Sequence, residues 1–259
     1  MVFHVLTIFR EFFEGPLDHG ILSRAKRSGQ IDIRLLDLRD YTSDAHCTVD
    51  DRPFGGDEGM VLKIEPIDKA LRAVRTDWHT KRTRTILLSA QGRLFDQAAA
   101  RRLATYDEIA LICGRYEGVD ERVAEYLVDE ELSVGNFVVT GGEWAAGIVI
   151  DSVTRLLPGV LGNEASSHRE SFAETQEGTI GILDFPQYTR PARYSKWRAP
   201  DALLSGHHGE IRKWRRRAAL EKTCRNRPDL LDLEDLSEDE RQWLRPLMER
   251  AEKQTREDD

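Results

Sequence analysis

Apolar runs of strand length alternate with amphipathic segments along roughly the first 160 residues. Five runs are rich in branched and aromatic residues and are short enough to be buried strands, at residues 2–9, 31–38, 85–89, 108–113 and 132–140. Apolar residues at helical spacing predict helices at residues 18–28, 65–74, 96–104, 120–127 and 143–157. Near-continuous apolar strands that alternate with helices are typical of a parallel sheet covered on both faces. The sequence therefore predicts an α/β domain.

Glycine-bearing loops follow three of the predicted strands. In the last run, L-S-V-G-N-F-V-V-T-G-G-E at residues 132–143, Phe137–Val139 lie between Gly135 and the pair Gly141–Gly142, which predicts a buried strand that ends in a tight turn. Similar loops follow Ser89 and Cys113. Ligands of parallel sheets bind outside the carboxyl ends of the strands, and glycine lets a backbone approach a ligand closely. We therefore expect a nucleotide-like cofactor at these loops, although the glycine fingerprints of NAD and ATP sites do not occur.

The pattern changes after residue 161. Residues 162–182 lack helical or strand periodicity and are rich in Ser, Glu, Thr and Gly, which is typical of a linker. Residues 203–225 have the pattern of a long helix, and the capping box Ser237-x-x-Glu240 predicts the start of a last helix. The chain is therefore expected to contain an α/β domain at 1–161, a flexible linker at 162–182 and a small helical domain at 183–259.

Charge is distributed unevenly along the chain. The net charge of the 259 residues is −8, which disfavours nonspecific binding of nucleic acid by the whole surface. Residues 207–227, however, carry eight Lys or Arg against two acids, and residues 228–259 carry twelve acids against five bases. Ile211, Trp214 and Ala218 share one face of the predicted helix, and the basic residues surround it. Such a face can simply be solvated, but this density of bases favours contact with phosphates.

The cysteine and hydropathy patterns favour a cytoplasmic protein. Cys47, Cys113 and Cys224 are far apart and form no C-x-x-C pair, so we expect neither a disulfide framework nor a zinc site. No apolar run reaches the roughly 18 residues that a membrane helix needs, and the first residues lack the basic region of a signal peptide. His207 and His208 stand without further ligands and predict no metal centre.

Several motifs occur in order along the chain: D-D-R-P-F-G-G at residues 50–56, C-G-R-Y-E-G-V-D-E-R at 113–122, G-G-E at 141–143, D-S-V at 151–153, P-G-V-L-G at 158–162, Y-T-R-P at 188–191, L-S-G-H-H at 204–208 and I-R-K-W at 211–214. Together, over essentially the whole chain, they resemble the bacterial TrmD family. These proteins are tRNA (guanine-N1)-methyltransferases of the SPOUT superfamily.

The resemblance implies a fold and a set of partners that the periodicity alone does not reveal. It implies a SPOUT-type parallel sheet with a trefoil knot at its C-terminal end, a flexible linker and a small α-helical C-terminal domain. Family members are homodimers in which each active site is shared between subunits. They use S-adenosylmethionine and Mg²⁺, and they methylate the guanine immediately 3′ of the tRNA anticodon, position 37, when another guanine precedes it.

The resemblance also assigns roles to residues by position. It implies a cofactor pocket made of Ser89, Gly114, Glu117, Val134, Gly135, Asn136, Phe137, Val138, Val139, Gly141 and Gly142. The catalytic arginine falls on Arg155, and the general base, an aspartate of an Asp-Ser-Phe run in the family, falls on Glu170 of Glu170-Ser171-Phe172. The basic helical domain would bind tRNA through His207, Arg212, Lys213, Arg215, Arg216 and Arg217.

These residue types suit the chemistry of guanine N1. The nitrogen is a poor nucleophile while it is protonated, so a carboxylate within hydrogen-bond distance is needed to take the proton as the new bond forms. Negative charge then develops on the ring, largely at O6, where a fixed guanidinium stabilises it.

Three other functions fit parts of the pattern. Another SPOUT methyltransferase could act on a different RNA base, but the Glu-Ser-Phe segment beside a basic helical domain favours guanine-N1 chemistry. A binding module that has lost its base would explain a glutamate in place of aspartate. A dinucleotide-dependent oxidoreductase is disfavoured by the missing glycine fingerprint.

Overall fold

The computed structural model describes residues 1–56, 58–162, 170–173 and 181–258, without the side chains of 250–258. Within the described part, the chain divides into two compact units, Met1–Glu164 and Ala165–Asp259. Most of the predicted linker, residues 163–169 and 174–180, lies outside the described residues. Each unit is considered by itself below.

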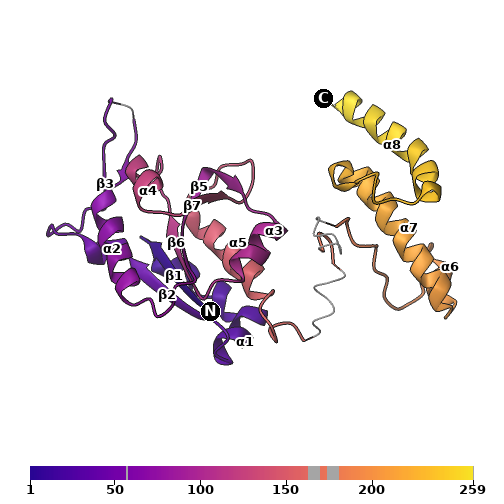
Figure 1. The fold of residues 1–259 in the computed structure, drawn as a ribbon, viewed down its shortest axis with the longest axis horizontal. Helices are drawn as coiled ribbons and strands as arrows, with labels where there is room; N and C mark the ends of the chain where they lie inside the picture. Colours follow the sequence, from indigo (N-terminus) through magenta and orange to yellow (C-terminus); the bar gives the residue numbers. More distant parts are fainter. Residues whose placement is uncertain (57, 163–169, 174–180, 259) are drawn as a thin grey trace. The chain divides into compact units, whose positions relative to one another are not determined.

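A five-stranded parallel sheet forms the centre of the first unit (Figure 1). The strand order is β2-β1-β6-β5-β7, and the strands are β1 (Val2–Thr7), β2 (Asp32–Asp37), β5 (Thr83–Leu94), β6 (Glu108–Cys113) and β7 (Glu130–Ser133). All four neighbouring pairs are parallel, as the apolar runs predict. Every residue of β6 is buried, because this strand lies in the middle of the sheet with helices over both faces.

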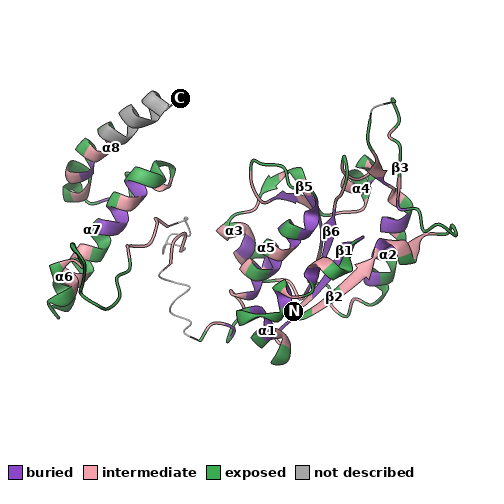
Figure 2. Cartoon of the chain, turned by 180° about the vertical axis from the view of Figure 1, so that it is seen from behind, coloured by how far each residue is buried: buried purple, intermediate pink, exposed green. Residues whose placement is uncertain are grey.

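Helices cover the two faces of the sheet in two groups: α1 (Gly20–Arg27), α3 (Gln97–Leu103) and α5 (Gly142–Thr154) on one, α2 (Ile64–Thr76) and α4 (Glu121–Tyr126) on the other. Alternate residues of the strands divide between the faces. In β6, Leu111 belongs to the core under α5 and Ile112 to the core under α2. Figure 2 shows the resulting buried layer at the centre of the unit.

Short elements surround this sheet. The 3₁₀ turns η1 (Arg10–Phe13), η2 (Pro16–Asp18) and η3 (Leu38–Tyr41) follow strands β1 and β2. The two-residue strands β3 (Asp50–Asp51) and β4 (Val61–Leu62) pair in an antiparallel manner and close the intervening loop at its base, forming the projecting finger of Figure 1. Residue 57 of this loop lies outside the described residues.

The predicted strand at 132–140 is wrong in position. The strand is Glu130–Ser133, and Phe137, Val138 and Val139 lie in the following loop with exposed fractions of 57%, 87% and 39%. The pairing of β7 with β5 ends at Ser133, beyond which these apolar side chains have no neighbouring strand to cover them. Phe137–Val139, between Gly135 and Gly141, therefore belong to a loop. Branched and aromatic residues favour strands only where neighbouring strands or the core cover them.

The second unit is helical, with a short hairpin of β8 (Arg193–Tyr194) and β9 (Trp197–Arg198). The helix predicted at 203–225 is two helices, α6 (Asp201–Leu204) and α7 (His208–Asn226), because Gly206 adopts a φ of +74° and ends the first one. The turn η5 (Pro228–Leu230) leads to α8 (Glu238–Asp258). The predicted capping box is confirmed: the Ser237 amide donates to Glu240 Oε2 at 2.9 Å, and the Glu240 amide donates to Ser237 Oγ at 3.3 Å.

Candidate active site

A cavity of about 270 Å³ lies at the carboxyl ends of β6 and β7 and beside residues 87–91 of β5, where the pairing of β5 with β7 is irregular between Leu88 and Arg93. This is the edge at which parallel sheets bind ligands, and the volume is close to the lower end for small-molecule pockets. The lining includes Ser89, Gly114, Glu117, Val134, Phe137, Val138, Val139, Gly141 and Gly142. Of the predicted cofactor residues, only Gly135 and Asn136 are missing from this lining. The loop that was predicted to be a strand therefore forms one wall of the cavity.

Close contact between two backbone segments explains the second glycine of the pair. The Gly142 amide donates to the Gly114 carbonyl at 2.9 Å, so the start of α5 lies directly against the loop after β6. A Cβ at Gly142 would lie 2.7 Å from Cys113 Cα, a distance that the fixed backbone cannot accommodate. Only glycine allows these two walls of the cavity to meet.

A buried carboxylate holds the walls together. Glu143 is fully buried, and its Oε1 accepts a hydrogen bond from Thr7 Oγ1 at 2.7 Å while its Oε2 accepts one from Arg115 Nε at 3.0 Å. Arg115 also donates to the Thr140 carbonyl at 3.0 Å and lies over the Phe9 ring. One carboxylate thus connects the end of β1, the loop after β6 and the loop before α5. Removing one partner of such a buried pair typically costs about 3–5 kcal/mol of stability.

The sequence around Glu143 contains a signal for this structural role. Glu143 stands at helical spacing from Ala146, Ile150 and Val153, all of which are fully buried. A charge on the buried stripe of an apolar helix requires a partner of opposite charge, and Arg115 supplies it.

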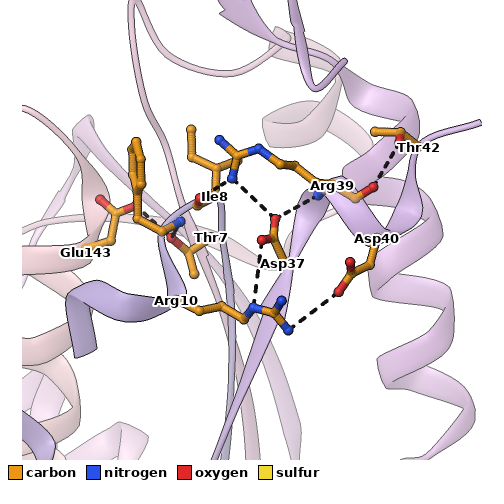
Figure 3. A network of polar contacts seen from close by, with 9 residues as sticks. Thr7, Ile8, Arg10, Asp37, Arg39, Asp40, Thr42 and Glu143 are labelled. Atoms are coloured by element: carbon orange, nitrogen blue, oxygen red, sulfur yellow. Dashed lines mark hydrogen bonds and ion pairs between the residues drawn. The ribbon is translucent and has the colours of Figure 1, made fainter. Parts of the chain in front are cut away.

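A polar network continues this anchoring along the ends of β1 and β2 (Figure 3). Asp37, the last residue of β2, accepts a hydrogen bond from the Arg39 amide at 2.9 Å and lies 3.8 Å from Arg10 Nε. Arg10 also lies 3.6 Å from Asp40, and the Arg39 guanidinium donates to the Ile8 carbonyl. The long ion-pair distances and partial exposure make these pairs weak, so their effect is to orient the strand ends next to Thr7.

Cys113, at the end of β6, is not a nucleophile. Burial raises the pKa of its thiol well above the usual value, and the nearby Glu143 carboxylate raises it further. The thiol is therefore protonated at neutral pH and contributes only packing.

The finger between β3 and β4 reaches the cavity through Glu117. The Glu117 amide donates to the Met60 carbonyl at 3.0 Å, and the Glu117 side chain packs against Gly59 so closely that a Cβ there would lie 2.6 Å from its Cγ. The residues of the finger that contact this cavity residue are thus Gly59 and Met60, which follow the D-D-R-P-F-G-G motif. Phe54, in the same finger, is fully exposed.

The two predicted catalytic residues belong to different units. Arg155 is the C-cap residue of α5 in the first unit, where its amide donates to the Asp151 carbonyl at 3.1 Å, and it does not line the 270 Å³ cavity. Glu170 belongs to the second unit and lines another cavity, of about 780 Å³, together with Asp184, Arg215 and Arg216.

The predicted basic helix is α7, and several of its bases contact the second unit itself. Arg216 Nε donates to Glu240 Oε1 at 2.8 Å, Arg217 lies over the Trp243 ring at 4.4 Å, and Arg215 lies over the Phe185 ring at 4.7 Å. Lys213 pairs with Glu210 at 3.1 Å at the surface. Arg212 is exposed, as is His207, the N-cap residue of α7. Residues 215–217 therefore hold α7 against its neighbours as well as carrying charge.

Metal-binding clusters and membrane-spanning helices do not occur among the described residues. Among them, no group of three or more His, Cys, Asp or Glu side chains is arranged to hold a metal ion. None of the helices in this part of the chain is both long enough and apolar enough to cross a membrane.

Comparisons with known proteins identify the family of this chain. The family model described as tRNA (Guanine-1)-methyltransferase TrmD matches residues 1–233. A tRNA (guanine-N(1)-)-methyltransferase of Koribacter versatilis (strain Ellin345) is 52% identical over 259 residues, which cover 95% of this chain and 98% of the relative. The protein of the same name from Geobacter metallireducens is 49% identical, with 98% of this chain and 100% of the relative covered. The chain belongs to the TrmD family of tRNA (guanine-1)-methyltransferases.

Proposed function

We propose that this protein transfers a methyl group from S-adenosylmethionine to N1 of the guanine immediately 3′ of the tRNA anticodon, position 37. The observation that carries the proposal is the family match over residues 1–233, together with relatives of about half-identical sequence that are named for guanine-N1 methylation of tRNA. A tRNA substrate places the reaction in the cytoplasm.

The cavity beside residues 87–91 of β5 and the carboxyl ends of β6 and β7 is suited to the cofactor. S-adenosylmethionine, when bound, supplies a methyl group that its sulfonium has already activated. Backbone groups of Gly114, Gly141 and Gly142 line the cavity without side chains, which suits an adenosine moiety that needs hydrogen bonds in little space. The Glu143–Arg115 pair keeps the walls in place before the cofactor arrives.

A Gly142→Ala substitution is expected to weaken cofactor binding about tenfold or more. The new Cβ would lie 2.7 Å from Cys113 Cα and would push that part of the cavity wall away. Calorimetry with S-adenosylmethionine measures the effect. Gly147→Ala is the matched control in the same helix, because a Cβ there meets no atom within 4 Å. Affinity for tRNA should change little in both variants, and an equal loss of tRNA and cofactor binding in Gly142→Ala would point to unfolding instead.

Glu170 and Arg155 are proposed to perform the chemistry. Glu170 takes the N1 proton, and the Arg155 guanidinium stabilises the charge that develops at O6. Since the two residues belong to different units, the active site has to be assembled from a first and a second unit. In the family this happens between two subunits, and we extend the same homodimer to this protein. Trp144 and Ile148, exposed at 57% and 46% on α5, support an interface on this helix.

The remaining assignments follow the family in the same way. We propose a trefoil knot around the start of α5, supported by the bridge between Arg115 and Gly141 that brings this segment against the loop after β6. Residues 1–161 would bind the cofactor, 162–182 would link the units, and 183–259 would bind tRNA. The described residues offer no cluster suited to Mg²⁺, so no step is assigned to that ion.

The bases of α7 are proposed to contact tRNA phosphates, and Arg212 offers the cleanest test. Arg212→Gln is expected to reduce the slope of log affinity against log salt by about 0.7–0.9, because one phosphate contact is lost. Filter binding at several salt concentrations measures the slope. Lys81→Gln, an exposed charge of the first unit, is the control and should leave it unchanged. Arg216→Gln is less informative, since it also breaks the contact with Glu240. An unchanged slope in Arg212→Gln would show that this residue is merely solvated.

Methyl transfer to two tRNA transcripts tests the proposed function directly. The transcripts differ only in guanine or adenine immediately 3′ of the anticodon, and labelled S-adenosylmethionine reports the product. We expect label in the guanine transcript alone, at N1. Label at another base would indicate a different RNA methyltransferase, and cofactor binding without any label would indicate a binding protein that has lost catalysis.

A further inference from the structure

The turn that carries Glu170 is fastened to helix α7 through a short backbone segment. Residues 170–173 form a turn, closed by a hydrogen bond from the Ala173 amide to the Glu170 carbonyl at 3.1 Å. We call these residues the Glu170 turn. Residues 181–184, which we call the return segment, lie against it: the Gly181 amide donates to the Ala173 carbonyl at 2.7 Å, and the Phe172 amide donates to the Ile182 carbonyl at 3.3 Å.

A serine hydroxyl adds a third connection next to the proposed base. The Asp184 amide donates to Ser171 Oγ at 2.9 Å, and Ser171 directly follows Glu170. The position of the Glu170 backbone therefore depends on where the return segment lies.

Helix α7 fixes the return segment through one buried hydroxyl. Thr223 is fully buried, and its Oγ1 accepts a hydrogen bond from the Leu183 amide at 3.0 Å while it donates to the Ala219 carbonyl at 2.8 Å. This orientation of the hydroxyl proton leaves a lone pair directed at Leu183. Ile182 meanwhile packs against the core that contains Leu220 and Cys224.

The backbone of the Glu170 turn is also strained, which shows that its surroundings determine its shape. Phe172 adopts a φ of +64°, a left-handed conformation that costs a bulky residue roughly 1–3 kcal/mol. Its ring lies 5.7 Å from the Arg227 guanidinium at the end of α7. Such a conformation persists only where neighbouring contacts hold it, and strained residues of this kind cluster at functional sites.

We propose that Thr223 is a positioning residue for methyl transfer: its hydroxyl holds the return segment on α7 and thereby sets the position of Glu170. The inference rests on the proposed function, in which Glu170 takes the N1 proton. It gives α7 a second role, since the helix whose bases would bind tRNA also orients the carboxylate. A base has to lie within hydrogen-bond distance of its proton, and a displacement of about 1 Å can reduce a rate about 100-fold.

The test compares Thr223→Val with Thr223→Ser. Valine keeps the shape and removes the hydroxyl, so the single-turnover rate at saturating cofactor and tRNA should fall about 10- to 100-fold. The dissociation constants for both ligands should stay unchanged. Serine keeps the hydroxyl and should restore most of the rate. Leu244→Val is the matched control, because it reduces packing in the same core but removes no hydrogen-bonding group.

Amide hydrogen exchange tests the hydrogen bond between Leu183 and Thr223 without any turnover. In Thr223→Val, the Leu183 and Asp184 amides should exchange faster, while amides of the α7 interior should not. Wild-type exchange at Leu183 in this variant would show that Thr223 does not hold the return segment on α7. A wild-type rate would refute the positioning role, as would equal losses of rate in Thr223→Val and in a Leu244→Val protein of matched melting temperature. A wild-type protein that fails to methylate guanine would refute the proposed function. The exchange measurement would still decide whether Thr223 holds the return segment.

Discussion

A Glu170→Gln variant is expected to transfer methyl groups about 100- to 10,000-fold more slowly than the wild-type protein, because general base catalysis typically contributes that factor. Glutamine has nearly the same shape but cannot accept the N1 proton. Single-turnover kinetics at saturating cofactor and tRNA isolate the chemical step, and the binding constants of both ligands should remain the same.

Asp184→Asn is the informative companion to this variant. Asp184 lines the same cavity, and its side chain accepts hydrogen bonds from the Phe185 amide at 2.8 Å and from Gln187 Nε2 at 3.3 Å. The asparagine oxygen can keep the shorter contact with the Phe185 amide, and only the longer, exposed contact with Gln187 is lost, so we expect a small change in rate. A large loss in Asp184→Asn beside a nearly normal Glu170→Gln would transfer the role of base to Asp184.

The second large effect is expected at Arg155. Arg155→Gln should reduce the single-turnover rate about 100- to 1000-fold, since the loss of one donor to a developing oxyanion typically has this cost. Arg155→Lys should be intermediate, because lysine keeps the charge but not the planar fork of donors. The kinetics should show the loss in the chemical step rather than in the affinity for tRNA.

Thermal unfolding provides the control for both arginine variants. The Arg155 backbone is fixed by its hydrogen bond to the Asp151 carbonyl at 3.1 Å, which neither substitution alters. The melting temperature then reports whether the Arg155 side chain itself supports the fold. A slow variant that also melts early would mean that Arg155 supports the end of α5 instead of the transition state.

The parallel sheet could be predicted because its central strands β1 and β6 are buried on both faces. The run at 108–113 coincides with β6, since no residue of that strand meets solvent and its apolar pattern has no interruption. The pattern failed at Phe137–Val139, where apolar residues line a cavity instead of forming a strand. Local propensity cannot distinguish the two uses of such residues.

Contacts between distant residues were beyond a pattern-based analysis. The connection of Thr7, Arg115 and Glu143 joins three segments that only the folded sheet brings together. The same is true of Thr223 and Leu183, because a threonine within a helix has no distinctive spacing. Nine of the eleven residues that the motif resemblance assigned to the cofactor line one cavity, but the residues that hold its walls required the structure.

The place of β1 in the sheet has a consequence for synthesis on the ribosome. β1 lies between β2 and β6, and the partner of Val2 on β6 is Glu108, so this neighbour emerges roughly 100 residues later. At about 5–20 residues per second, the first strand waits on the order of 5–20 s for that neighbour. During the wait, the backbone edge of β1 that faces β6 is unpaired. Its apolar residues Phe3, Val5 and Leu6 are fully buried only in the finished fold. Strand β1 is thus made well before the sheet around it is complete, and it offers an open strand edge to a chaperone while the chain grows.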